Sequence, residues 1–145
     1  GAVGLAQLKK LPMVVQAQRT NKSEIWKSIA DLPGIIPREV PEGSIETADA
    51  LVFLVKDNLT ARRCREELLK VGLSPKILPE AYTWHFAGCW DHMPELVSSH
   101  GGNLEADFTQ SRELLARAVS LPVVVRMQDD VPSRVRSAIQ QGLGI

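Results

Sequence analysis

The sequence has little of what marks several large classes of protein. Its two cysteines, Cys64 and Cys89, are too few for a disulfide framework, so we expect reduced thiols and a cytoplasmic protein. Its 17 basic residues balance 17 acidic ones, which leaves no excess charge to attract nucleic acid or an anionic membrane. No apolar run approaches the roughly 20 residues of a membrane span, and the first residues do not have the basic region and apolar core expected of a secretory signal.

The motifs of common active sites are also missing. There is no G-x-S-x-G nucleophile elbow, no phosphate-binding P-loop and no G-x-G-x-x-G after a strand. The acidic pairs 66–67 and 129–130 fit a helix surface and a helix cap better than acid–base catalysis. The sequence therefore predicts no self-sufficient active site. Its helical pattern starts at the first residue, which indicates a piece of a longer polypeptide.

Apolar periodicity predicts the N-terminal half of the fold. Apolar residues at 3, 5, 8 and 11 indicate a short helix, and a second helix is expected over 12–31, with Pro12 in its first turn. A short edge strand is expected over 34–40, because Pro37 cannot donate a ladder hydrogen bond. The run 49–56 is typical of a strand buried on both faces.

The second half is expected to alternate between helices and strands. Asn58 is the predicted cap of a helix that closes at Gly72, followed by a brief strand over 74–79. Asp107 and Gln110 form a capping pair for the next helix, whose predicted buried face is Phe108, Leu114, Leu115 and Ala118. A strand over 121–127 and a last helix capped by Asp130 complete the chain.

This order of elements predicts an α+β fold. We expect a two-layer sandwich, in which a small, mostly antiparallel sheet carries helices on one face and a long helical segment precedes it. The expected organisation is a pair of connecting helices over 1–32 and a single globular unit over 33–145.

The segment 82–93, YTWHFAGCWDHM, concentrates reactive and aromatic side chains. It holds two of the three tryptophans, two of the three histidines and one of the two cysteines. One interpretation is a zinc site, because spacings of four and three place three ligands on one helical face. These ligands would be His85, Cys89 and His92, with His100 or Asp91 as the fourth. Against it, Gly88 interrupts the helix and the usual four-ligand spacing is absent.

Two further interpretations of this segment remain open. Trp84, Phe86 and Trp90 are large enough to fill space between a loop and a helix layer, as aromatic clusters usually do. Alternatively, the segment is a loop that presents Tyr82, Trp84 and His85 to a ligand cleft, since functional side chains concentrate on loops of a rigid scaffold.

Two features together resemble a known family. The opening AVGLAQLKKL resembles the helix that follows the catalytic domain in DegT/StrS-type sugar aminotransferases, which are pyridoxal-phosphate enzymes of fold type I. From Ala50 onward, the buried strand, the helix, the aromatic-histidine loop, the late strand and the closing helix follow the order of that family's C-terminal small domain. The resemblance covers nearly all 145 residues.

The resemblance implies transfer of an amino group from an amino-acid donor to a keto-sugar, carried on pyridoxal phosphate. In that family the Schiff-base lysine and the acidic partner of the pyridine nitrogen lie in the N-terminal large domain. None of the lysines here, at 9, 10, 22, 27, 56, 70 and 76, matches the family's lysine motif. The chain alone is therefore expected to be inactive, to need the large domain of the same protein, and to work within a homodimer.

The resemblance also implies a substrate-binding residue. His85 matches a histidine that the family often places in the loop facing the sugar. Its neighbours Tyr82 and Trp84 are expected to stack on the sugar or hydrogen-bond to the sugar. Family members often carry prolines and a tyrosine after that histidine, whereas this chain has 86–89, FAGC, so the class of sugar stays open. The alternative function is a free-standing ligand-binding or regulatory module, because small α+β folds serve many roles.

Overall fold

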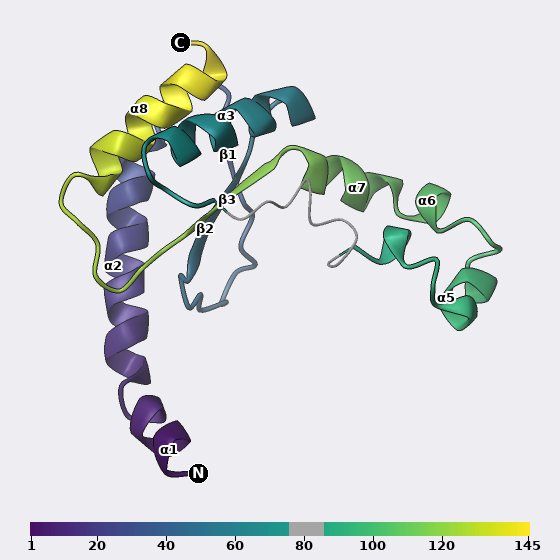
Figure 1. The fold of residues 1–145 in the computed structure, drawn as a ribbon, viewed down its shortest axis with the longest axis horizontal. Helices are drawn as coiled ribbons and strands as arrows, with labels where there is room; N and C mark the ends of the chain where they lie inside the picture. The colour runs from purple at the N-terminus through teal and green to yellow at the C-terminus, as the bar shows by residue number, and fades with distance from the viewer. Residues whose placement is uncertain (76–85) are drawn as a thin grey trace.

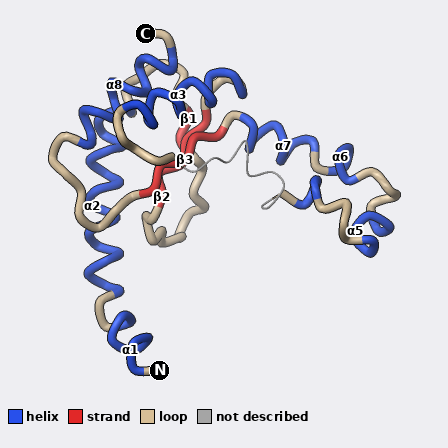
Figure 2. Tube along the Cα trace, viewed as in Figure 1, coloured by secondary structure: helices blue, strands red, loops and turns tan. Residues whose placement is uncertain are grey.

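The protein has an α+β architecture, seen in a computed structural model that describes residues 1–75 and 86–145 (Figures 1 and 2). Within these ranges, three antiparallel strands form a sheet in the order β1-β2-β3. Helices α3 and α8 pack on one face of this sheet, and the C-terminal half of α2 joins the same core. The expected fold class, with helices on one face and a long helical segment in front, is confirmed.

The N-terminal helices begin and end close to where the sequence predicts. Helix α1 spans Ala2–Leu8 and α2 spans Leu11–Ile29, with Pro12 in the first turn of α2, where its missing N–H costs nothing. In Figure 1, α1 and the N-terminal half of α2 extend away from the sheet as an arm. The polar middle of α2 is used structurally: Gln18 Nε2 donates to the Val123 carbonyl at 2.9 Å.

Strands β1, Ile36–Pro37, and β2, Ala50–Leu54, pair antiparallel, and β1 is at the edge as expected. The expectation that the second strand is buried on both faces is wrong. Leu51 and Phe53 are buried, whereas the residues that alternate with them are only partly covered. The reason is that α3 and α8 cover only the face of β2 that carries Leu51 and Phe53, so that burial along this strand alternates with the pleat.

Helix α3, Asn58–Lys70, is capped one residue earlier than predicted. The Asp57 carboxylate accepts a hydrogen bond from the Thr60 backbone N–H at 2.8 Å, so Asp57 and not Asn58 is the N-cap. At the other end of α3, Gly72 follows the last turn with a positive φ of 76°, as the sequence predicts for a glycine that ends a helix.

Strand β3, Ala118–Pro122, begins three residues before the predicted strand over 121–127. It pairs with β2 so that Leu121 lies opposite Leu51. After Pro122 the chain leaves the sheet, and the carbonyl of Val124 accepts a hydrogen bond from Asn21 at 2.8 Å. The valine run 123–125 therefore packs along α2 and is not a continuation of the strand. Helix α8, Val131–Leu143, closes the chain after Asp130.

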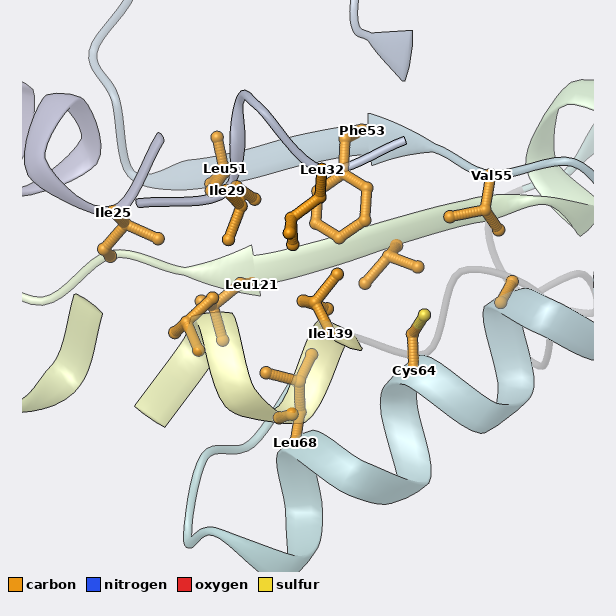
Figure 3. Close-up of a cluster of buried hydrophobic side chains, with 14 of the residues drawn as sticks. Ile25, Ile29, Leu32, Leu51, Phe53, Val55, Cys64, Leu68, Leu121 and Ile139 are labelled. Carbon is orange, nitrogen blue, oxygen red and sulfur yellow. The ribbon is translucent and has the colours of Figure 1, made fainter. Parts of the chain in front are cut away.

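One hydrophobic core joins these elements (Figure 3). It combines side chains from α2, the buried face of β2 and β3, α3 and α8. Its fully buried members include Ile25, Ile29, Phe53, Val55, Cys64, Leu68, Val135 and Ile139. Burial of a side chain of this size contributes about 1.5–3 kcal/mol, which makes this cluster the main source of stability.

Between α3 and β3 the described chain forms a second projection, built from short helices (Figure 1). These are η1 Ala87–Cys89, α5 Pro94–Ser99, α6 Leu104–Asp107 and α7 Thr109–Ala116. A helix does follow Asp107, as α7, but its N-cap residue is Phe108, and Asp107 is the last residue of α6, which Asn103 caps through a 3.1 Å bond from Ala106 N–H. Of the expected buried face, Leu114 is 46% exposed, and Ala118 is buried but belongs to β3. Most of the brief strand expected over 74–79 lies outside the described residues.

No helix among the described residues is long and apolar enough to cross a membrane.

Candidate functional site

The three predicted substrate-binding residues, Tyr82, Trp84 and His85, lie outside the described residues. The structure does describe the rest of the same segment, from Phe86 to Met93. Phe86 is buried, with 4% of its surface exposed, while Cys89 and Trp90 are half-buried. The first described residue of this segment, Phe86, is therefore well packed.

A tight turn follows Phe86. Cys89 N–H donates to the Phe86 carbonyl and Trp90 N–H donates to the Ala87 carbonyl, both at 3.0 Å. Gly88 is required by close packing, since a Cβ there would be 2.5 Å from Cε1 of the Phe86 ring. A larger residue at position 88 would therefore displace the Phe86 ring.

Arg112 of α7 reaches back to this turn. Its Nη2 donates to the Gly88 carbonyl at 3.3 Å, and its guanidinium carbon lies 4.9 Å from the centre of the Phe86 ring. The second distance is within the range of a cation–π interaction. Its Nη1 also lies 3.9 Å from the Cys89 Sγ. The Arg112 side chain therefore contacts three residues of the turn, Phe86, Gly88 and Cys89.

The projection has a small core of its own around the turn. Phe86 and Phe108 meet edge to face, with ring centres 6.1 Å apart and planes at 78°. This is a favourable aromatic geometry. Leu104 of α6, in the same projection, is also buried, at 2% exposed. For Phe86 the packing interpretation is confirmed, and the packing is local to this projection.

His100 stands at the end of α5. Its Nδ1 lies 2.8 Å from the Asp107 Oδ2, and its ring centre lies 5.1 Å from that of Phe108. The Asp107 carboxylate, which the sequence predicts as a helix cap, is instead bound to this histidine. The pair joins α5 to the end of α6.

The zinc interpretation gains no support from the described ligands. In the ranges 1–75 and 86–145, no three of the residue types His, Cys, Asp and Glu come together in a way that could hold a metal ion. His92 is exposed, His100 binds Asp107, and Cys89 faces Arg112. His85 lies outside the described residues.

Two hollows flank α7. One, of about 530 Å³, is lined mainly by polar residues at the start of α3 and on α7, including Lys56, Asp57, Glu113 and Arg117. The hydrogen bond from Thr60 N–H holds the pKa of Asp57 below its usual value, so this carboxylate serves as a helix cap and stays ionised. Acid–base chemistry is therefore not expected of Asp57.

The second hollow, of about 540 Å³, is apolar and lies on the sheet face opposite the helix layer. Val52 and Leu54 of β2 form its floor, and Leu114 and Leu115 of α7 line it as well. Helix α7 thus partly covers the face of the sheet that α3 and α8 leave open.

Sequence reasoning missed Arg112 as a residue of this region. It stands 24 positions from Gly88 in the sequence, and nothing in the pattern of α7 distinguishes it from a surface arginine. Only the fold brings the two segments together.

Comparison with known proteins extends this picture. The chain matches the model of the DegT/DnrJ/EryC1/StrS aminotransferase family over residues 1–140. Its fold is similar to that of sugar aminotransferase CalS13 from Micromonospora echinospora, with a TM-score of 0.69 and 19% identity over 98% of this chain and 34% of that chain. The aminotransferase TlmJ from Streptoalloteichus hindustanus gives a TM-score of 0.73 and 15% identity over 98% of this chain and 35% of that one.

A further similar structure is GDP-4-keto-6-deoxy-D-mannose-3-dehydratase from E. coli, solved with bound hydrated PLP. It has a TM-score of 0.66 and 17% identity over 96% of this chain and 34% of that chain. The chain thus spans about a third of the length of each of these structures.

Proposed function

Because the chain belongs to the DegT/DnrJ/EryC1/StrS aminotransferase family, we propose that it is the C-terminal small domain of a pyridoxal-phosphate-dependent sugar aminotransferase. The complete protein would transfer an amino group from an amino-acid donor to a keto-sugar. The observation that carries this proposal is the family match over residues 1–140, together with a fold that aligns along nearly the whole chain.

Three lysines in the described ranges are already paired with carboxylates, which supports a cofactor lysine that lies elsewhere in the polypeptide. The cofactor needs a lysine for its Schiff base and an acidic partner for its ring nitrogen. Lys22 is bound to both Glu46 carboxylate oxygens, at 2.8 and 2.7 Å, and Lys27 and Lys70 form surface ion pairs within their own helices. We therefore place the cofactor and its lysine in an N-terminal large domain of the same polypeptide, which in this proposal precedes residues 1–145.

Within the small domain we assign the sugar-facing role to the loop that carries Tyr82, Trp84 and His85. Support comes from its position: the next residues, 86–89, form a hydrogen-bonded and closely packed turn, which is the kind of anchor that a recognition loop needs. Residues 1–32 would connect the domains and 33–145 would form the small domain itself. We further propose a cytoplasmic homodimer.

The test uses the full-length protein purified with its cofactor. We expect amino transfer from an amino-acid donor to at least one sugar of a keto-sugar panel, and we expect the chain 1–145 alone to bind no pyridoxal phosphate by absorbance. A gene in which this segment begins the protein would contradict the proposal.

Because one similar structure is titled as a dehydratase, the assay should follow both amination of the sugar and loss of its hydroxyl group. Loss of the hydroxyl group would still agree with membership of the family, but it would replace amino transfer with dehydration as the reaction. Thermal-shift screening of the chain 1–145 distinguishes a free-standing binding module from the aminotransferase and dehydratase functions. A ligand that binds this domain alone would raise its melting temperature.

A further inference from the structure

We propose that the N-terminal arm, residues 2–15, is the surface on which the large domain of the same polypeptide packs. The inference rests on the proposed function, which supplies that domain, and it adds where on this chain the two domains meet. The arm comprises α1 and the first turns of α2, which extend away from the sheet (Figure 1).

The first observation is the exposure of the arm's apolar side chains. None of the residues of α1 is buried. Five large apolar side chains are between 48% and 76% exposed, namely Val3, Leu5, Leu8, Leu11 and Met13. Single exposed apolar side chains are ordinary on a protein surface, but a concentration of them over a few helical turns is typical of a contact surface.

The second observation is the lack of charge. Residues 1–18 contain two charged residues, Lys9 and Lys10, whereas the overall share of 23% corresponds to about four in a stretch of this length. Depletion of charged residues marks the centre of a protein interface, and a helix that faces water normally has a charged side. Helix α1 has no charged residue on any side.

Helix α3 shows what a solvated helix of this chain looks like. Most of its exposed residues are charged, namely Arg62, Arg63, Glu66 and Lys70. Helix α1 exposes more of its surface than α3 does but has only apolar and uncharged residues to expose. The difference between the two helices therefore indicates that α1 is covered in the complete protein.

The third observation is the continuity of one helix face. Leu11 precedes Ile25 by 14 residues and Ile29 by 18, and both spacings are close to whole numbers of helical turns. Ile25 and Ile29 are buried in the core, whereas Leu11 on the same face is 48% exposed. The apolar face of α2 thus extends beyond the core that covers its C-terminal end.

The large domain is the occupant that the comparisons favour. The similar structures align with nearly the whole of this chain but with only 34–35% of their own length, so about two thirds of each lies outside the match. In the proposed function, that remainder is joined to the arm by the chain itself. A tether of this kind gives an effective concentration of about millimolar, which allows a small surface to hold a domain.

A second copy of this chain fits the arm less well. A stable pair of proteins buries about 1,200 Å² or more in total. Helix α1 has seven residues, so two such helices supply only a small part of that area. Contact through the arm is therefore assigned to the tethered domain.

The first experiment measures thiol accessibility in the full-length protein. Leu8→Cys and the control Leu69→Cys are treated with iodoacetamide, and modification of each site is followed by peptide mass spectrometry. In the chain described here Leu8 is 62% exposed and Leu69 47% exposed, so without a covering domain position 8 would react at least as fast. We expect position 8 to react about tenfold more slowly, because a covered thiol reacts only when its cover opens. Equal rates would overturn the proposal.

The second experiment identifies the occupant. Full-length Lys9→Cys, coupled to a photoreactive maleimide, is prepared in normal and ¹⁵N-labelled forms, which are mixed and allowed to exchange subunits. We expect cross-links between position 9 and residues that precede residue 1, with both peptides carrying the same isotope. Links that combine the two isotopes would assign the arm to a second copy and overturn the proposal.

These measurements separate this inference from the proposed function. A full-length protein that aminates a keto-sugar but leaves position 8 as reactive as position 69 would retain the function and contradict the interface. A protein that aminates no sugar of the panel, yet protects position 8 and gives links within one polypeptide, would support the interface and contradict the function.

Discussion

Gly142 of α8 lies directly against Cys64 of α3. A Cβ atom added at Gly142 would be 2.5 Å from the Cys64 Cα and 2.7 Å from both its backbone nitrogen and its Sγ. The two helices that cover the sheet therefore touch backbone to backbone at this point. The glycine sits inside a helix, where its flexibility is a cost, so close approach is the reason for its presence.

We expect Gly142→Ala to destabilise the protein. In an open helix this change gains about 0.5–1 kcal/mol, but overpacking of a tight core typically costs about 1–3 kcal/mol. The obstructing atoms here belong mainly to the Cys64 backbone, which cannot rotate away as a flexible side chain would. We therefore expect a net loss of at least about 1 kcal/mol in the free energy of unfolding, measured with urea.

The matched control is Gly4→Ala, a helical glycine of α1 with no atom within 4 Å of the added Cβ. It should not destabilise the protein. A Gly142→Ala variant as stable as the control would show that α3 and α8 do not approach as described.

The two cysteines should differ sharply in reactivity. Cys64 is fully buried, and burial raises the pKa of its thiol to about 11. At pH 8 only about one thiol in a thousand would be ionised, and the thiolate is the reactive form. Cys89 is half-buried. We expect a thiol reagent to modify one cysteine in the native protein and the second only after unfolding.

Replacing Cys89 with serine should then abolish the native reaction. Rapid labelling of Cys64 in folded Cys89→Ser protein would contradict the buried position of this thiol.

Much of the fold follows from apolar periodicity, since β2, α3 and α8 each bury a regular pattern of side chains. Two of the errors occur where neighbouring residues or segments satisfy the same local rule. Asp57 and Asn58 are both good caps, and only the bond to Thr60 decides between them. The valines at 123–125 favour a strand locally, but pairing of Leu121 with Leu51 fixes β3 earlier in the chain.

The neighbourhood of the site was less predictable for a different reason. Aromatic content singled out the segment 82–93, and its packing interpretation is confirmed for Phe86, which is buried. The contact of Arg112 with Gly88, however, joins two segments that only the tertiary fold brings together. The apolar periodicity of a single sequence predicts local elements, but it does not predict which residues far apart in the chain come into contact.

Stability should depend on the ionisation of Glu46. Hydrogen bonding from Lys22, with Arg38 adding a smaller effect, holds the pKa of this carboxyl below its ordinary value of 4.5. A carboxyl with a lower pKa in the folded state stabilises the protein above its ordinary pKa, and this contribution is lost as pH falls through the folded value. We therefore expect stability to decline below about pH 4.5, partly through Glu46.

Glu46→Gln should reduce stability at pH 7 by about 1 kcal/mol or less, since the side chains are partly exposed and screened. The difference from wild type should shrink as pH falls toward 3, as followed by thermal unfolding. Glu42→Gln, an exposed change in the same loop, serves as the control and should give a profile parallel to wild type. A constant difference between Glu46→Gln and wild type across this range would contradict the ion pair.

Helix α1 should contribute almost nothing to the stability of this chain. None of its residues is buried, and its seven residues are fewer than the roughly 12–15 that an isolated helix needs in water. Leu5 is 57% exposed, whereas Leu68 of α3 is fully buried. The same substitution at the two positions should therefore have very different effects. Leu68→Ala should cost about 2–5 kcal/mol and Leu5→Ala less than about 0.5 kcal/mol, by urea unfolding.

Hydrogen exchange gives an independent check on the same point. Amides of α1 should exchange by local fraying, while those of α8 around Val135 and Ile139 should exchange only by global unfolding. A loss of more than about 1 kcal/mol in Leu5→Ala would mean that α1 packs against another surface in solution. If that surface belonged to a second copy of the chain, the loss would depend on protein concentration, whereas an intramolecular contact would give the same value at every dilution.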